Sequence, residues 1–185
     1  MPATAASPAV DIAAPPAVQR VQGTMAAITI RSARLSDAAA ISSLTAQLGY
    51  DLPESDATSR LSRLLSDGRH DFLVAESGAL VVGWLHAAVV EYIEVGAFVI
   101  VGGLVVDRAH RGQGIGRLLM AEAEGWARAQ GCSLVRLWST SARTAAHRFY
   151  EALGYTKVKT QFSFVKSLDP SRREDLSRFV PRVEE

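Results

Sequence analysis

The sequence predicts a mixed α+β fold in which one mostly antiparallel, twisted sheet is flanked by about four helices. Apolar, β-branched runs of strand length occur along the chain, and segments with apolar residues at helical spacing lie between them. Glycine follows most of the helical segments, which is typical of helix C-termini. With 185 residues and 48% hydrophobic content, the chain is long enough for one sizeable core and too short for two. We therefore expect one domain, over residues 27–168.

The first half of this domain is predicted to contain a strand, two helices and a hairpin. Residues 27–31 alternate apolar and polar side chains, which is typical of a short strand. Residues 36–49 and 55–65 each begin with Ser-Asp, a helix-capping pair, and carry isoleucine or leucine at helical spacing. Ser-Gly separates the strands expected at 72–76 and 79–90, so we expect a tight turn between them.

The second half is predicted to contain three strands and two helices. The apolar run 97–106 is interrupted by two adjacent glycines, which is typical of a buried central strand with a bulge or bend. A helix with one apolar stripe is expected over 115–131, followed by a strand at 134–138 and a helix at 143–154. Residues 155–165 alternate apolar and polar side chains again, which predicts a final strand.

Both ends of the chain differ in composition from the domain. Residues 1–26 are rich in alanine and hold four of the seven prolines without any periodicity, so we expect a disordered tail. This tail lacks the basic start and continuous apolar core of a secretory signal. Residues 169–185 are charged and carry two prolines, and we expect a loosely attached C-terminal tail.

Composition also narrows the partners and the compartment. A net charge of +1 gives no reason to expect nucleic acid or an anionic membrane as the main partner. No apolar run reaches the roughly 18 residues that a membrane span needs. Cys132 is the single cysteine, so the chain cannot form an internal disulfide, which fits a reducing cytoplasm. We therefore expect a cytoplasmic protein.

A loop with glycine at every second position joins the central strand to the next helix. Glycine lets the backbone approach a ligand closely, and a helix start offers unpaired N–H donors and a partial positive charge. The expected occupant is therefore a phosphate or pyrophosphate. The loop consists of Arg111, Gly112, Gln113, Gly114, Ile115 and Gly116.

Two common phosphate-binding motifs do not match this loop. A dinucleotide fingerprint reads G-x-G-x-x-G and has an acidic residue at the end of the next strand, where this chain has Arg136-Leu137-Trp138. A nucleotide P-loop ends in Gly-Lys followed by Ser or Thr, whereas Gly116 is followed by Arg117.

The pattern R-x-x-G-x-G after an apolar strand resembles the acyl-CoA loop of the GNAT superfamily of N-acetyltransferases. The order of elements over roughly residues 28–168 is similar as well. The resemblance implies a GNAT fold with a sheet of six to seven strands, split between the central strand and the strand near Leu134. It implies acetyl-CoA as co-substrate, with the loop amides on its diphosphate and its pantetheine arm bonded to the backbone of Leu104, Val105 and Val106. A homodimer is compatible with the family.

The resemblance also assigns two residues of the last helix. Tyr150 matches the GNAT tyrosine that stands near the thioester sulfur, and we expect it to be the general acid. A phenol with pKa near 10 stays protonated at pH 7 and can donate to a thiolate. Arg143 occupies the position where many relatives carry an asparagine that contacts the CoA arm. A guanidinium there could meet a phosphate or face solvent. No spacing typical of metal ligands occurs, and we expect no metal.

The base that deprotonates the acceptor amine is less sharply indicated. An amine with pKa near 10 must lose a proton before it attacks the thioester. Glu94 or Glu91, acting through a water molecule, is the preferred candidate. His86 and Asp51 lie on segments that line the acceptor side in this family, and they stay open as alternatives. The remaining histidines are predicted to be surface residues: His70, His110 and His147.

The expected acceptor is a small primary amine that contacts Tyr50 and Asp51. Acidic side chains on the two acceptor-side loops would favour a cationic amine, although solvated loop charge explains them equally well. One alternative is acetylation of a protein lysine or N-terminus, which needs an open groove. Another is a CoA-binding sensor without turnover, against which the presence of Arg111, Gly114 and Tyr150 together argues. Neither nucleic acid nor a membrane is expected as a partner.

Overall fold

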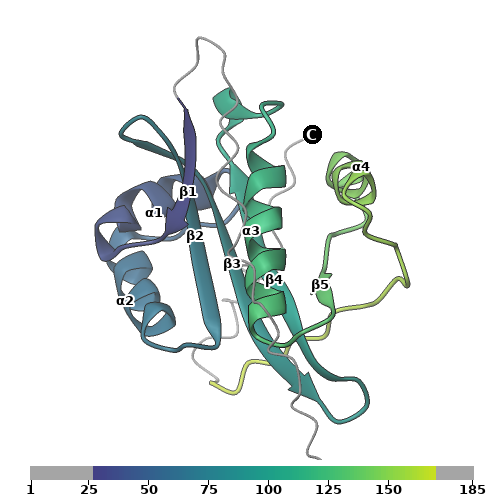
Figure 1. Ribbon diagram of the computed structural model, residues 1–185. Helices are drawn as coiled ribbons and strands as arrows, with labels where there is room; N and C mark the ends of the chain where they lie inside the picture. Colours follow the sequence, from purple (N-terminus) through teal and green to yellow (C-terminus); the bar gives the residue numbers. More distant parts are fainter. Residues whose placement is uncertain (1–26, 170–185) are drawn as a thin grey trace, which may run out of the picture.

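The computed structural model describes residues 27–169, which form one five-stranded sheet with helices on both faces (Figure 1). The expectations for the two tails lie outside the described residues, apart from residue 169. Neighbouring strands are antiparallel from β1 to β4, and β4 and β5 are parallel. The strands, in their order across the sheet, are β1 (Ile28–Ser32), β2 (His70–Ser77), β3 (Leu80–Tyr92), β4 (Gly96–Val106) and β5 (Val135–Leu137).

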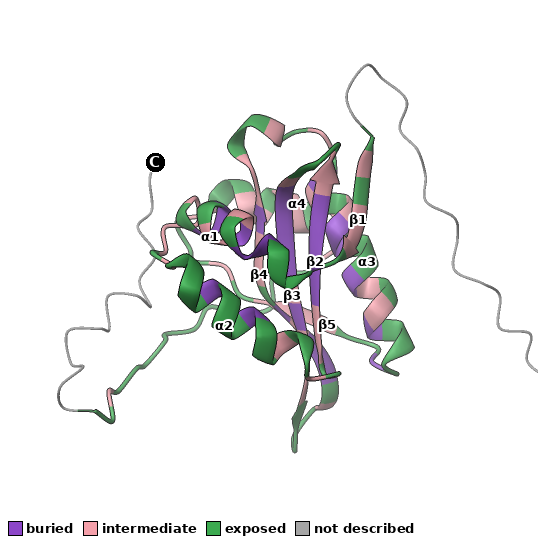
Figure 2. Cartoon of the chain, turned by 90° about the vertical axis from the view of Figure 1, so that its left-hand side faces the viewer, coloured by how far each residue is buried: buried purple, intermediate pink, exposed green. Residues whose placement is uncertain are grey.

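Two helices cover one face of the sheet and a third covers the other. Helices α1 and α2 lie together on one face, α3 runs along the opposite face, and α4 lies beyond the end of β5, at the upper right in Figure 1 (Figures 1 and 2). The mixed α+β fold is thus confirmed. The helices are α1 (Ala38–Ala46), α2 (Glu54–Leu65), α3 (Ile115–Ala129) and α4 (Thr144–Ala152), with short 3-10 turns η1 (Leu35–Asp37) and η2 (Arg108–His110).

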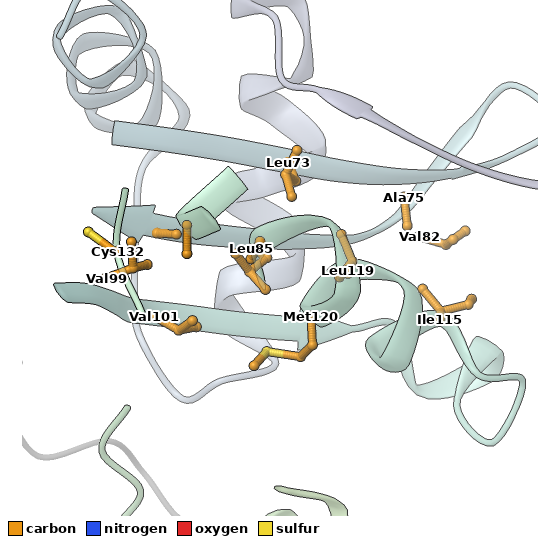
Figure 3. Packing of buried hydrophobic residues seen from close by; sticks show 13 residues of the cluster. Leu73, Ala75, Val82, Leu85, Val99, Val101, Ile115, Leu119, Met120 and Cys132 are labelled. Carbon is orange, nitrogen blue, oxygen red and sulfur yellow. The ribbon is translucent and has the colours of Figure 1, made fainter. Parts of the chain in front are cut away.

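Each face of the sheet has its own hydrophobic core. On the α3 face, Leu85 and Val99 of the sheet pack against the apolar stripe of α3, in which Leu119 is fully buried (Figure 3). Full burial of one such side chain contributes roughly 1.5–3 kcal/mol. On the α1/α2 face the core consists of Ala33, Ile41, Leu44, Leu61, Phe72, Val74, Trp84 and Val105.

The two adjacent glycines of β4 form the predicted bulge. His86 pairs with Gly103 and Ala87 with Val101, so Gly102 is an extra residue in β4. A Cβ on Gly103 would lie 2.7 Å from two ring atoms of Trp84, and one on Gly102 would lie 3.3 Å from His86 Nδ1. Both glycines therefore face the rings of β3 on the same side of the sheet, and at Gly103 only glycine leaves room for the ring.

The sheet opens between β4 and β5 from this bulge toward the C-terminal end of β4. The two strands pair only from Val99 to Val101, opposite Val135 to Leu137. Strand β4 then continues to Val106, whereas β5 ends at Leu137. Residues 102–106 of β4 therefore have a pairing partner on the β3 side alone within the described part of the chain. We call this opening the split, and its closed end lies at the bulge.

The predicted final strand over 155–165 does not form. This segment has no regular secondary structure, and Phe162 and Phe164 are 90% and 93% exposed. The sheet thus has five strands instead of the six to seven expected. Alternation of apolar and polar residues makes a strand possible, but a ladder also needs a partner edge, and β5 offers only three residues. Gln161 contacts Arg136 and Trp138 at 3.4 Å each.

Candidate active site

The glycine loop has the geometry that the sequence predicted. Gly112 and Gly114 have φ of +76° and +80°, a region that favours glycine, and nothing lies within 4 Å of a Cβ built on either residue. Gly114 is the N-cap of α3 and offers no capping side chain. The first N–H groups of α3 therefore lie at an open surface, which suits an anionic ligand.

The third glycine of the loop has a different physical reason. A Cβ on Gly116 would lie 3.1 Å from Cζ of Phe149, which belongs to α4. Gly116 thus allows Phe149 to pack against the first turn of α3. The same contact places the neighbouring Tyr150 relative to the loop.

Tyr150 lies in the core on the α3 face. It packs edge-on against Phe149 and Tyr155, and its cluster includes Leu104 and Leu137 from the two sides of the split. Burial raises the pKa of the Tyr150 hydroxyl, and the nearby Arg143 opposes this effect. Tyr150 therefore carries its proton at neutral pH.

Arg143 makes a contact that the sequence did not indicate. Its guanidinium donates a hydrogen bond to the backbone carbonyl of Leu48, at 2.8 Å. This bond ties the start of α4 to the segment after α1. A contact between Arg143 and a cofactor stays a prediction.

The segment between α1 and α2 is fastened to the end of β4 as well. Gln47 donates from Nε2 to Asp107 Oδ2 at 2.9 Å, and Gln47 Oε1 accepts from the backbone N–H of Arg108 at 3.0 Å. The hydrogen bond from Gln47, followed by those from His110 and the backbone, lowers the pKa of Asp107. Because Tyr50 and Asp51 follow Gln47 after only Leu48 and Gly49, these bonds hold the predicted acceptor loop near the end of β4. Sequence reasoning missed Gln47, since a glutamine at a helix end carries no local signal of a partner 60 residues away.

Two buried polar atoms beside the split have no hydrogen-bond partner among residues 27–169: the indole Nε1 of Trp84 and the hydroxyl of Ser139. Trp84 lies on β3 behind the bulge, and Ser139 follows the end of β5. A buried donor without a partner costs free energy, so each of these atoms needs an explanation, and a bound water or ligand would supply one. Neither residue was singled out from the sequence.

A row of aromatic rings crosses β2 and β3 on the α1/α2 face. Trp84, Phe72, His86 and His70 follow one another with centroid separations of 5.4, 5.5 and 5.2 Å. His70 Nδ1 lies 3.0 Å from His86 Nε2, a hydrogen bond. Burial, followed by the proximity of His70, lowers the pKa of His86 to about 4.

The three histidines predicted to be surface residues are neither fully exposed nor fully buried. His70, His110 and His147 are all half-buried, and each has a polar partner. His70 pairs with His86, His110 Nδ1 lies 3.2 Å from Asp107 Oδ1, and His147 Nε2 lies 2.9 Å from the carbonyl of Thr140. Their partners come from sheet pairing and loop packing, which spacing along the chain does not reveal.

Glu91 and Glu94, the preferred base candidates, lie exposed in the hairpin between β3 and β4. The hairpin lies at one end of the sheet, and the glycine loop lies at the other end (Figure 1). Glu91 is five positions from His86 along β3, which corresponds to about 16 Å. The structure therefore does not bring them to the closed end of the split. Their catalytic role stays a prediction.

No group of three or more His, Cys, Asp or Glu side chains within residues 27–169 has the arrangement of a metal site. Within the same residues, no helix has the length and apolar character to cross a membrane.

A family model described as Acetyltransferase (GNAT) family matches residues 38–155, from α1 through α4. The chain therefore belongs to the GNAT acetyltransferase family, a family of acyltransferases. The matched range includes the glycine loop, both sides of the split and Tyr150.

Two curated relatives carry N-acetyltransferase names. The aminoglycoside N(6')-acetyltransferase type 1 of Stenotrophomonas maltophilia is 28% identical over 148 residues, which are 77% of this chain and 95% of that protein. A mouse protein named probable N-acetyltransferase family 8 member 5 is 33% identical over 111 residues, 58% of this chain. The match spans about half of the mouse protein, 49% of its length.

Solved structures share the fold. The aminoglycoside 6'-N-acetyltransferase AAC(6')-Ig of Acinetobacter haemolyticus superposes with a TM-score of 0.68 at 22% identity, over 76% of this chain and 99% of that one. The aminoglycoside N-acetyltransferase AAC(6')-Iy in complex with CoA gives a TM-score of 0.70 at 18% identity, over 75% and 94%. A transcriptional regulator from Bacillus halodurans gives 0.67 at 26% identity, over 75% and 99%.

Proposed function

We propose that this protein transfers the acetyl group of acetyl-CoA to the primary amine of a small molecule. The observation that carries the proposal is the open, uncapped start of α3 standing at the mouth of the split between β4 and β5. Membership in the GNAT family and the CoA complex of a structural neighbour support the choice of donor.

The donor is proposed to lie with its diphosphate on the loop amides of residues 112–116 and its pantetheine arm in the split. The amides of that arm can bond the backbone of Leu104, Val105 and Val106, because within residues 27–169 the β5 side of this stretch has no strand partner. The unpartnered hydroxyl of Ser139 offers a further hydrogen bond from the β5 side.

In the proposed reaction the neutral amine nitrogen attacks the thioester carbonyl, the C–N bond forms and the C–S bond breaks. Tyr150 gives its proton to the departing thiolate. The raised pKa of Tyr150 keeps the phenol protonated until a thiolate with pKa of about 8.5 appears. A second group must first take a proton from the ammonium form of the acceptor, and Glu91 and Glu94 stay the carboxylate candidates, although they lie at the other end of the sheet.

Tyr50 and Asp51 are proposed to meet the acceptor, because the Gln47 and Arg143 hydrogen bonds hold their segment near the split. The relatives named aminoglycoside acetyltransferases favour a small polyamine over a protein amine. A reducing cytoplasm, where acetyl-CoA is available, is the proposed location, and a homodimer remains compatible with the family.

The test is release of free CoA thiol from acetyl-CoA, followed with an aminoglycoside, a linear polyamine and a lysine-containing peptide as acceptors. We expect saturable thiol release with at least one small amine and none with the peptide. Turnover with the peptide alone would indicate a protein acetyltransferase. CoA binding without thiol release from any acceptor would overturn the proposal in favour of a sensor.

A further inference from the structure

We propose that His86 and His70 form a proton relay that takes the proton from the acceptor amine at the closed end of the split and delivers it to solvent beside Asp67. This inference rests on the proposed acetyl transfer and assigns its missing base.

The relay begins at the bulge of β4. His86 Nδ1 lies 3.3 Å from the position of a Cβ on Gly102, so the imidazole stands directly over the extra residue. Gly102 is solvent-exposed although it lies in the interior of a central strand. The bulge therefore borders an opening, and the free ring nitrogen of His86 faces that opening at the level where β4 and β5 separate.

His86 and Tyr150 lie on opposite faces of the sheet. Tyr150 packs in the α3-face core, whereas His86 stacks on Phe72 of the α1/α2-face core. A thioester that occupies the split would thus have the acid on one side and the imidazole on the other. This arrangement suits the reaction, because the departing sulfur and the attacking nitrogen lie on different sides of the carbonyl carbon.

The neighbours of the pair set the tautomers that a relay needs. Asp67 Oδ2 lies 3.9 Å from His70 Nε2, and this carboxylate favours a proton on that nitrogen. His70 Nδ1 then carries a lone pair and accepts the hydrogen bond from His86 Nε2–H. The second nitrogen of His86, Nδ1, is left with its lone pair toward the bulge, where it can accept a proton from an ammonium group.

The proton transfers balance without any other reactant. The ammonium N–H bond breaks as His86 Nδ1 takes the proton, while His86 Nε2 passes its own proton to His70 Nδ1. His70 Nε2 in turn releases a proton to water beside Asp67, and the neutral amine attacks the thioester. A lowered pKa keeps His86 neutral at pH 7, so it can accept a proton but does not hold it.

Among the described residues, the charged groups next to the pair come from the turn before β2 and from β2 itself. Asp67 is bonded to Arg69, which lowers the pKa of that carboxyl to about 2, so Asp67 stays ionised. Asp71 follows on β2, but its side chain lies on the other face, where burial and Glu122 of α3 raise its pKa. From α1 and α2, the side chains of the hydrophobic core on this face include Ile41, Leu44 and Leu61, and α1 also buries Thr45.

The experiment compares His86→Gln and His70→Gln with the full-length parent, using acetyl-CoA and an amine that the parent acetylates. Thiol release is followed from pH 6 to pH 10. We expect both variants to lose roughly 10²-fold in kcat near pH 7, with an unchanged KM for acetyl-CoA. The loss should shrink as the pH rises through the pKa of the acceptor amine, because a neutral acceptor no longer needs a base. Arg128→Gln, at an exposed position of α3 that pairs with Glu124 at 3.8 Å, is the control.

A second readout does not depend on turnover. NMR of the ring nitrogens should show His86 neutral at pH 6, with its proton on Nε2. A proton on Nδ1, or a loss of kcat that is equal at every pH, would overturn the relay, and so would full activity of both variants. A pH-dependent loss in Glu91→Gln instead would assign the base to the hairpin. A parent without thiol release from any amine would overturn the proposed function and the relay together.

Discussion

Gln47 at the end of α1 and Asp107 at the end of β4 are joined side chain to side chain at 2.9 Å, although they lie 60 residues apart. The same amide also accepts from the backbone of Arg108, so one residue positions the acceptor loop against the strand that leads to the glycine loop. We expect Gln47→Ala to raise the KM for the acceptor several-fold, while the KM for acetyl-CoA changes less. Stability should fall by about 1 kcal/mol, as is usual for a lost hydrogen bond. Gln130→Ala, at the exposed end of α3, is the control, and an equal rise in both KM values would contradict a role confined to the acceptor loop.

Gly114→Asp tests the diphosphate site. The substitution puts a carboxylate where the diphosphate is expected and strains a residue with φ of +80°, so CoA affinity should fall at least tenfold. Calorimetric titration with CoA measures it. Gly78→Asp adds the same charge at φ of +62° in the β2–β3 turn, and it should bind CoA like the parent. Unchanged affinity in Gly114→Asp would place the diphosphate elsewhere.

Tyr150→Phe tests the general acid. Loss of the phenolic proton should lower kcat by about 10²-fold and leave CoA binding nearly unchanged, since the ring and its packing remain. Tyr155→Phe is the matched control, because it removes the hydrogen bond from Tyr155 to Glu124 at 2.9 Å but no proposed catalytic group. Steady-state kinetics and thermal unfolding separate the two: Tyr155→Phe should lower stability, and Tyr150→Phe should lower kcat. A fully active Tyr150→Phe would remove the tyrosine from the mechanism.

Gly103→Ala tests the close packing at the bulge. The new Cβ would lie 2.7 Å from two atoms of the Trp84 ring, which is itself buried, so we expect a loss of about 1–3 kcal/mol in the free energy of unfolding. In a Trp84→Leu background, where the clashing ring is absent, Gly103→Ala should cost less free energy of unfolding than it does in the parent. Urea unfolding measures both. Additive effects would show that the ring and the bulge do not interact.

The pH dependence of stability follows from the lowered pKa of His86, which is about 4 in the folded chain against an ordinary value of 6.5. Between these values the unfolded chain binds a proton that the folded chain excludes, so acid favours unfolding. The contribution of His86 is fully present above pH 6.5 and is lost as the pH falls toward 4. Between pH 7.5 and pH 4.5, the free energy of unfolding of the parent should therefore fall by about 2 kcal/mol more than that of His86→Gln. If the difference in free energy of unfolding between the two proteins is the same at both pH values, His86 is not buried in its neutral form.

Features with a local signal could be predicted from the sequence. The glycine loop, the bulge at Gly102 and the helix that carries Tyr150 depend on residue types close together in the chain. The pairing of His70 with His86 depends on the register of β2 against β3, and the Gln47 bonds join segments far apart. Neither leaves a pattern in the sequence. The strand expected over 155–165 failed for the related reason that alternation describes a segment and not the edge it must pair with.

Gly116 brings the first turn of α3 against the ring of Phe149, so the glycine loop and the helix that carries Tyr150 are in direct contact. A Cβ at Gly116 would lie 3.1 Å from Cζ of Phe149, and the ring next to Tyr150 would have to shift to make room. If the loop binds the acyl donor and Tyr150 is the general acid, as proposed, reshaping the loop for bulkier donors would therefore also disturb the packing around the acid. Tolerance for new donors is better sought along the β5 side of the split, near Ser139.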